Sequence, residues 1–198
     1  KRGSEKYPKF SDMARHLADL YSASCSAGVR MKGDGEVLYF SMEYIADAYI
    51  GEKLTGQVAD FLKEFVFSPL ICEGGFLPAY VESEKNNLKN SILGLINDKK
   101  EYADVKCREA MFGTDGYGMF EAGYVEDLDG ITPENLYAFY QDVLRNAKVD
   151  IFIGGTVEAD MADRIAGIFG PELAPRSAGY IKTQVAVPKR GEIQTVTE

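Results

Sequence analysis

Residues 76–98 place the strongest constraint on the fold, because their apolar side chains repeat with the period of an α-helix. The repeating side chains stand three, four and seven residues apart and are Tyr80, Leu88, Ile92, Leu95 and Ile96. Such spacings put side chains on one stripe of a helix. Glu84 and Ser91 are seven residues apart, so they share a face of the same helix, two turns from each other. The sequence predicts a long central helix, and whether this face acts on a substrate or only packs is the functional question.

Length and charge indicate a globular, acidic protein. The chain has 198 residues, 45% of them hydrophobic, which is enough for a core. Its net charge is −9, whereas nucleic acids and anionic membranes bind basic surfaces. No apolar run approaches the roughly 18 residues that a membrane helix needs. We therefore expect a soluble, cytoplasmic protein without a nucleic-acid or membrane partner.

Helical and extended patterns alternate irregularly along the rest of the chain. Helical patterns cover residues 12–21, 55–67, 100–112, 133–145 and 159–169. Extended patterns cover residues 24–32 and 36–45, joined by a Gly-Asp-Gly turn, and the apolar run 149–155. This order favours an α+β fold, a mixed sheet covered by helices, over a regular doubly wound fold.

Local signals add detail to this prediction. Ser11 is the expected N-cap of the first helix, and Thr132 with Pro133 begins a later one. The run 149–155 is expected to be a short buried strand. The predicted core consists of Tyr39, Phe40, Phe61, Phe65, Leu88, Ile92, Leu95, Phe139, Ile151 and Ile153.

The residue types do not supply an obvious catalytic set. A zinc hydrolase of the H-x-x-E-H kind needs two histidines four residues apart, and this chain has one, His16. A serine triad lacks its base for the same reason. Gly113, Gly116 and Gly118 are not followed by the Lys-Ser/Thr pair of a phosphate loop. The residues alone indicate an α+β domain without assigned chemistry.

Four segments resemble, in this order, the inverzincin metallopeptidases, the family of pitrilysin, insulin-degrading enzyme and the mitochondrial processing peptidase. They are GSEKYP (3–8), LADLYSASCSAGV (17–29), VESEKNNLKNSI (81–92) and YGMFEAGYVEDLDGITPENLYAFYQDVLRNAKVDIFIGG (117–155). The resemblance is closest to zinc-lacking bacterial members that pair with an active homologue and are associated with modification of elongation factor P. Each segment is a weak signal alone and a fairly specific one in this order.

The resemblance implies a lost metal site. Active members carry two glutamates seven apart on the central helix, the second being the third zinc ligand; these positions are Glu84 and Ser91 here. A serine hydroxyl is a poor zinc ligand, so the resemblance implies no catalytic and no metal-binding residue in this chain. Zinc is expected only if a longer parent chain supplies ligands upstream of residue 1. The family's substrate-holding Asn-Ala pair falls on Ser26 and Ala27.

The resemblance also implies an organisation and a binding edge. Residues 1–170 would form a peptidase-homology domain that lacks its N-terminal edge, and 171–198 a closing extended segment and the start of an interdomain linker. Family members hold a peptide by adding it to a sheet as an extra strand. The corresponding peptide-binding residues here are Ser24, Cys25, Ser26, Ala27, Gly28 and Val29.

Three functions remain open on the sequence. The leading one is a non-catalytic subunit that contributes peptide binding and a chamber wall to an assembly with an active homologue, either a homologous subunit or a second homologous domain. One alternative is an active zinc endopeptidase whose motif lies upstream of residue 1. The other is a purely structural interaction domain.

Overall fold

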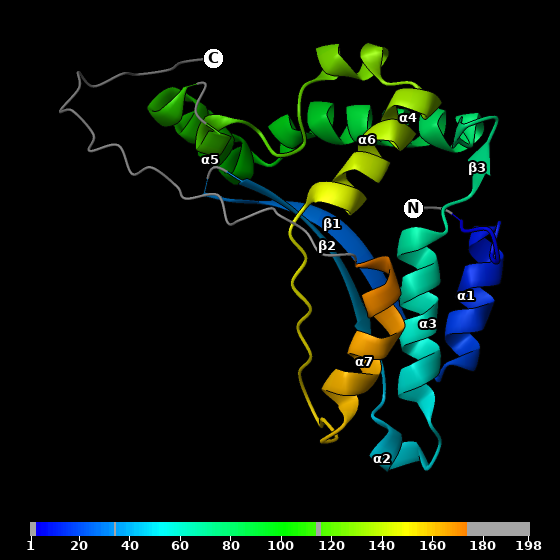
Figure 1. Cartoon of the computed structure of the whole chain (residues 1–198). Helices are drawn as coiled ribbons and strands as arrows, with labels where there is room; N and C mark the ends of the chain where they lie inside the picture. The colour runs from blue at the N-terminus through cyan, green and yellow to red at the C-terminus, as the bar shows by residue number, and fades with distance from the viewer. Residues whose placement is uncertain (1–2, 34, 114–115, 174–198) are drawn as a thin grey trace.

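The computed structural model describes residues 3–33, 35–113 and 116–173 (Figure 1). The α-helices are α1 (Phe10–Asp19), α2 (Asp47–Ile50), α3 (Leu54–Phe67), α4 (Pro78–Gly94), α5 (Lys99–Phe112), α6 (Pro133–Asn146) and α7 (Met161–Phe169). The strands are β1 (Ser24–Lys32), β2 (Gly35–Glu43), β3 (Ile71–Cys72) and β4 (Gly75–Phe76). Short 3₁₀ turns are η1 (Leu95–Asn97), η2 (Gly116–Gly118), η3 (Val125–Gly130) and η4 (Gly170–Glu172). The predicted α+β class is confirmed.

Strands β1 and β2 form a nine-residue antiparallel hairpin that packs on α3. The pairing runs from Ser24 opposite Glu43 to Lys32 opposite Gly35. Figure 1 shows α3 between α1 on one side and α7 on the other, with the hairpin behind them. The main core lies where these elements meet and consists of Met13, Leu20, Ala23, Leu54, Val58, Phe61, Phe65 and Val66. Helix α3 is therefore the central element of the packing.

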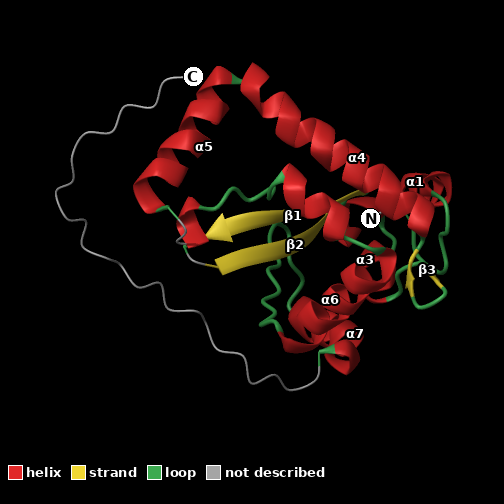
Figure 2. Ribbon diagram, turned by 90° about the horizontal axis from the view of Figure 1, so that it is seen from above, coloured by secondary structure: helices red, strands yellow, loops and turns green. Residues whose placement is uncertain are grey.

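Helices α4 and α5 lie on a different side of the molecule from this core. Figure 2 shows them as an arc, joined at a sharp corner, with β1 as the hairpin strand nearer to them. The corner forms where Gly94 ends α4 and Asp98 begins α5 by accepting hydrogen bonds from the amides of Lys100 and Glu101. An aspartate at this position satisfies amides that a helix leaves unpaired at its start.

Several predicted helix ends are confirmed. Helix α5 ends at Gly113, whose φ of 56° lies in the left-handed region that favours glycine. Helix α6 begins with Thr132 and Pro133, and Thr132 exchanges capping hydrogen bonds with Asn135. The expected cap at Ser11 is wrong, because α1 already begins at Phe10.

The predicted buried strand at 149–155 is also wrong. These residues form no strand, and the side chain of Phe152 is 93% exposed. An apolar strand needs a hydrogen-bonded neighbour and a covering layer, and no strand of the described part of the chain pairs with this segment. The expected mixed sheet is likewise absent there: the described strands form two separate antiparallel pairs.

The core prediction is confirmed for α3, holds in part for β2 and for Ile92 and Leu95, and is wrong for four other residues. Phe61 and Phe65 are buried, and Tyr39, Phe40, Ile92 and Leu95 are half-buried. The predicted core residues that are exposed are Leu88, Phe139, Ile151 and Ile153. Helix α4 buries only Val81 of its residues, and its apolar stripe is only partly covered by the described residues, since Ile92 is half-buried while Leu88 and, beyond the helix, Ile96 are exposed. The predicted extended segment and linker within 174–198 lie outside the described residues.

No helix that the structure describes has the length and apolar character needed to span a membrane.

Asp47 fixes the connection between the hairpin and α3. Its Oδ1 accepts hydrogen bonds from the amides of Leu54 and Thr55 and from the Thr55 hydroxyl, at 2.9–3.0 Å. Oδ2 lies 3.8 Å from Nη2 of Arg164 on α7, and the side chain is only 9% exposed. Burial acts to raise the pKa of Asp47, but the hydrogen bonds from Thr55 and Leu54 and the charge of Arg164 outweigh it, so this pKa lies below its usual value.

We predict that Asp47→Ala lowers the free energy of unfolding by about 1–3 kcal/mol, because it leaves buried donors without an acceptor. Asp60→Ala, on the exposed side of α3, is the matched control and should change it by less than about 0.5 kcal/mol. Urea unfolding measures both. Because the pKa of Asp47 is depressed by folding, its contribution is complete above the unfolded pKa of about 4 and is lost as the pH falls below it. Equal effects of the two variants at pH 7 would contradict the assignment.

Candidate functional site

The open edge of β1 is the first part of the candidate site. In the described residues β1 pairs with β2 alone, so its other edge carries no strand. This edge contains every residue predicted to bind peptide: Ser24, Cys25, Ser26, Ala27, Gly28 and Val29. It also lies on the side of the hairpin toward α4 and α5 (Figure 2). The structure thus brings the predicted peptide edge and the central helix to the same side of the molecule.

The two faces of the hairpin have different environments, because successive side chains alternate between them. On one face, Phe40 and Met42 of β2 and Cys25 of β1 pack against the main core. The rings of Phe40 and Phe65 meet edge to face, 6.0 Å between their centroids. This packing fixes which face of the hairpin is turned toward α3 and leaves the other face accessible.

The accessible face carries small and polar side chains along β1. Ser26 and Ser41 share a hydrogen bond of 2.7 Å between their hydroxyls. Next along the strand, Gly28 stands opposite Tyr39, and a Cβ at Gly28 would come within 2.6 Å of the Tyr39 hydroxyl. The aromatic ring therefore occupies the space that a side chain at position 28 would take. Beyond it, the guanidinium of Arg30 lies 4.7 Å from the centroid of the Tyr39 ring.

Helix α4 is the second part of the site and is held in place by two hydrogen bonds to the surrounding chain. The Tyr80 hydroxyl donates to the carbonyl of Pro8, and Lys85 Nζ donates to the carbonyl of Ile131, each at 3.1 Å. Glu84 and Ser91 are both exposed on this helix. Their predicted placement on one long helix is confirmed.

Ser91 lines an open cavity of about 330 Å³ at the corner between α4 and α5. The other lining residues are Gly94, Leu95, Asp98, Glu101, Phe120, Glu121 and Ala122. Asp98 is already engaged in capping α5. The cavity is thus lined at position 91 by a neutral hydroxyl and on its α5 side by the carboxylates of Asp98 and Glu101.

The donor set does not fit a zinc ion. Among the residues that the structure describes, no three histidine, cysteine, aspartate or glutamate side chains are grouped closely enough to hold a metal. The histidine of the chain, His16, lies on α1 and stacks on Tyr7, 4.8 Å between ring centroids. Burial, with the charge of Lys6 as a second cause, lowers the pKa of His16. It belongs to the packing between α1 and α3, and no metal chemistry follows from the described residues.

Comparison with known proteins agrees with this residue set. No protein-family model matches the chain. Over 161 residues, 80% of the chain, it is 31% identical to the "Probable inactive metalloprotease YmfF" of Bacillus subtilis (strain 168), of which the match covers 38%. The chain is similar to a probable inactive metalloprotease. A solved structure, described as a conserved protein from Enterococcus faecalis V583, superposes on 98% of the chain with a TM-score of 0.86 and 31% identity.

The match to the Enterococcus faecalis protein covers 45% of that chain, so the present chain spans less than half the length of the two proteins that it matches. The likeness to YmfF supports a non-catalytic, peptidase-like protein.

Sequence analysis identified the edge and the helix but missed Arg30 and Tyr39. The available signal was Gly28 within an otherwise regular strand. A glycine inside a strand often marks a place where another group approaches closely. The identity of that group depended on the register that sets Gly28 opposite Tyr39, which the structure supplies.

We predict that the 198-residue chain, loaded with zinc chloride and then dialysed, retains far less than one zinc per chain by elemental analysis. Ser91→Glu should leave this value unchanged, because one added carboxylate still lacks the two or three further ligands of a zinc site. Ser91→Ala is the matched control for the loss of the hydroxyl. Zinc near one per chain in the unmodified protein would contradict the conclusion that these residues form no metal site.

Proposed function

We propose that this chain is the non-catalytic part of a pitrilysin-type peptidase assembly and binds extended peptides along the open edge of β1 without cleaving them. The observation that carries the proposal is this edge, which extends over nine residues on the side of α4 and α5. An extended peptide added there would gain main-chain hydrogen bonds that do not depend on its sequence. Peptides of differing sequence would therefore bind through the same backbone contacts.

The composition of the edge supports this use. Ser24, Ser26, Ala27 and Gly28 are small, so a peptide backbone meets little steric obstruction beside them. An unprotected edge strand exposes a protein to aggregation, and natural proteins commonly cover or charge such edges. Retention of a long edge with mostly small side chains is consistent with a strand that receives a ligand.

In this assembly the present chain does not hydrolyse the peptide, and a partner carries out the cleavage. Ser91 offers no charge to hold zinc, and the likeness to a protein named as an inactive metalloprotease supports the same conclusion. The resemblance of residues 3–157 to zinc-lacking members that pair with an active homologue supports a homologous subunit, or a second homologous domain, as the partner. Modification of elongation factor P is the process proposed on that resemblance. An active peptidase with an upstream motif would need a third ligand in place of Ser91.

The location proposed is the cytoplasm. None of the three cysteines, all of which the structure describes, forms a disulfide, and Cys72 and Cys107 are exposed. Exposed free thiols are typical of a reducing compartment.

An interaction domain without peptide binding is a second candidate, and one observation favours it. The apolar side chains of Ile151, Phe152 and Ile153, which follow one another in the chain, are exposed. Exposed apolar side chains that lie together commonly mark a contact with another protein segment. Peptide binding at β1 separates the two candidates, because an interaction domain of this kind needs none.

We predict that Ala27→Pro weakens the binding of an extended peptide to the 198-residue chain by about tenfold or more. Proline removes a backbone donor and its ring obstructs the strand. Ala46→Pro is the matched control, because Ala46 lies outside the hairpin and its φ of −64° already suits proline. Fluorescence anisotropy with a labelled, blocked seven-residue peptide of alternating threonine and valine measures both affinities. Unchanged affinity in Ala27→Pro, with an unchanged circular dichroism spectrum, would refute the edge assignment.

A further inference from the structure

Arg30 stands at a defined position on the accessible face of the hairpin. It shares this face with Ser26 and Gly28, because the three residues are two apart along β1. Its guanidinium lies over the Tyr39 ring, which in turn lies over Gly28. Val37 stands directly opposite Arg30, and Tyr39 is two residues further along β2, in the diagonal position. Long side chains in diagonal positions of an antiparallel pair can touch, which accounts for the contact between Arg30 and Tyr39. The stacking holds the positive charge on the face of the hairpin that carries Ser26 and Gly28, beside the ring that covers Gly28.

Among the described residues of the hairpin, no carboxylate stands next to Arg30 on its own face. Its cross-strand partner is Val37, and Lys32 adds a second positive charge two residues further along β1. Glu36 pairs with Met31 and so belongs to the opposite face, while Glu43 pairs with Ser24 at the far end of the hairpin. None of the ion pairs found among the described residues includes Arg30. A local positive region thus lies on a protein with a net charge of −9.

We propose that Arg30 selects peptides with an acidic side chain at the position beside Gly28 and Arg30. The inference rests on the proposed binding of peptides to β1 and adds the class of peptide to it. In an added strand, every second side chain falls on the accessible face. The side chain beside Gly28 would meet the Tyr39 ring that covers this position, and the guanidinium of Arg30 lies over the same ring, so a glutamate there would share its face with the cation. Tyr39 is the positioning residue, since it holds the guanidinium over its ring.

The size of the preference for an acidic peptide depends on how exposed Arg30 is to solvent. Arg30 is exposed, so its attraction for a carboxylate is screened by water and salt. Exposed ion pairs of this kind change affinity by a modest factor, about two- to fivefold at low ionic strength. Binding through the backbone sets the overall affinity, and Arg30 sets the preference among peptides. The preference should decrease as salt is added.

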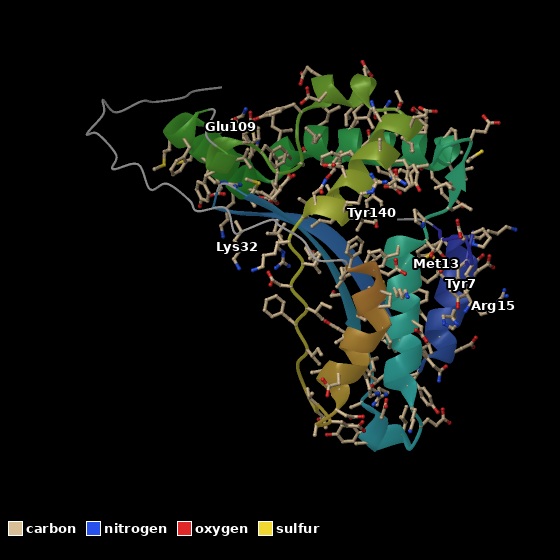
Figure 3. All side chains as sticks on the ribbon, in the orientation of Figure 1. Tyr7, Met13, Arg15, Lys32, Glu109 and Tyr140 are labelled. Carbon is tan, nitrogen blue, oxygen red and sulfur yellow. The ribbon has the colours of Figure 1, made fainter. Side chains whose placement is uncertain are left out.

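The experiment compares two labelled, blocked peptides on the 198-residue chain by fluorescence anisotropy. The peptides are Thr-Val-Thr-Glu-Thr-Val-Thr and the same sequence with glutamine in place of glutamate. The variants are Arg30→Gln and the matched control Arg15→Gln, which makes the same change of charge on an exposed arginine of α1. Figure 3 shows Arg15 on α1, on the opposite side of the molecule from Lys32 near the hairpin turn.

The expected result is a two- to fivefold tighter binding of the glutamate peptide to the unmodified chain and to Arg15→Gln. In Arg30→Gln the two peptides should bind equally. Equal binding of both peptides to the unmodified chain would overturn the inference while the binding function stands. A preference that persists in Arg30→Gln would overturn the assignment to Arg30. Absence of binding by either peptide would overturn the proposed function and this inference with it.

Discussion

The packing of one face of the hairpin against α3 is the interaction on which the remaining structure depends. Phe40 contacts Phe65 edge to face, and Phe65 stacks near Phe61 within α3, 6.3 Å between centroids. Loss of such a buried ring typically costs about 3–5 kcal/mol. Because α3 also contacts α7 and closes the core with α1, this contact orients the hairpin relative to the helices. The orientation decides which face and which edge of β1 stay accessible.

The sequence predicted correctly those features, such as helix ends, that depend on neighbouring residues alone. Thr132 with Pro133 and the glycine at position 113 end or begin helices through their own backbone preferences, and the structure has those ends where the sequence placed them. The run 149–155 shows where this reasoning stops. Its apolar residues have the composition of a buried strand, yet burial requires a neighbouring strand and layer, and the described residues provide neither. The predicted burial of Leu88 on α4 is wrong for the same reason.

The sequence likewise predicted some parts of the candidate site and not others. Ser24 to Val29 were placed on a strand by their pattern, and their role as a peptide edge came from a family resemblance. Glu84 and Ser91 were placed on one helix by their spacing, and both lie on α4, which is shorter than the predicted 76–98 because Phe76 belongs to β4 and Leu95–Asn97 form a 3₁₀ turn. The contact of Arg30 with Tyr39 could not be predicted from the sequence, because it depends on the register of the two strands and on the position of the Tyr39 ring over Gly28. Chemistry that depends on a single residue, such as the poor metal affinity of serine, was readable from the sequence alone.

The central claim is that the open edge of β1 binds an extended peptide and that the chain does not cleave this peptide. Hydrogen–deuterium exchange of the 198-residue chain, measured with and without a saturating extended peptide and followed by mass analysis of that peptide, tests both halves at once. The account predicts slower exchange in β1, little change in α1, and a peptide recovered intact. Unchanged exchange across residues 24–32, or recovery of a cleaved peptide, would contradict it.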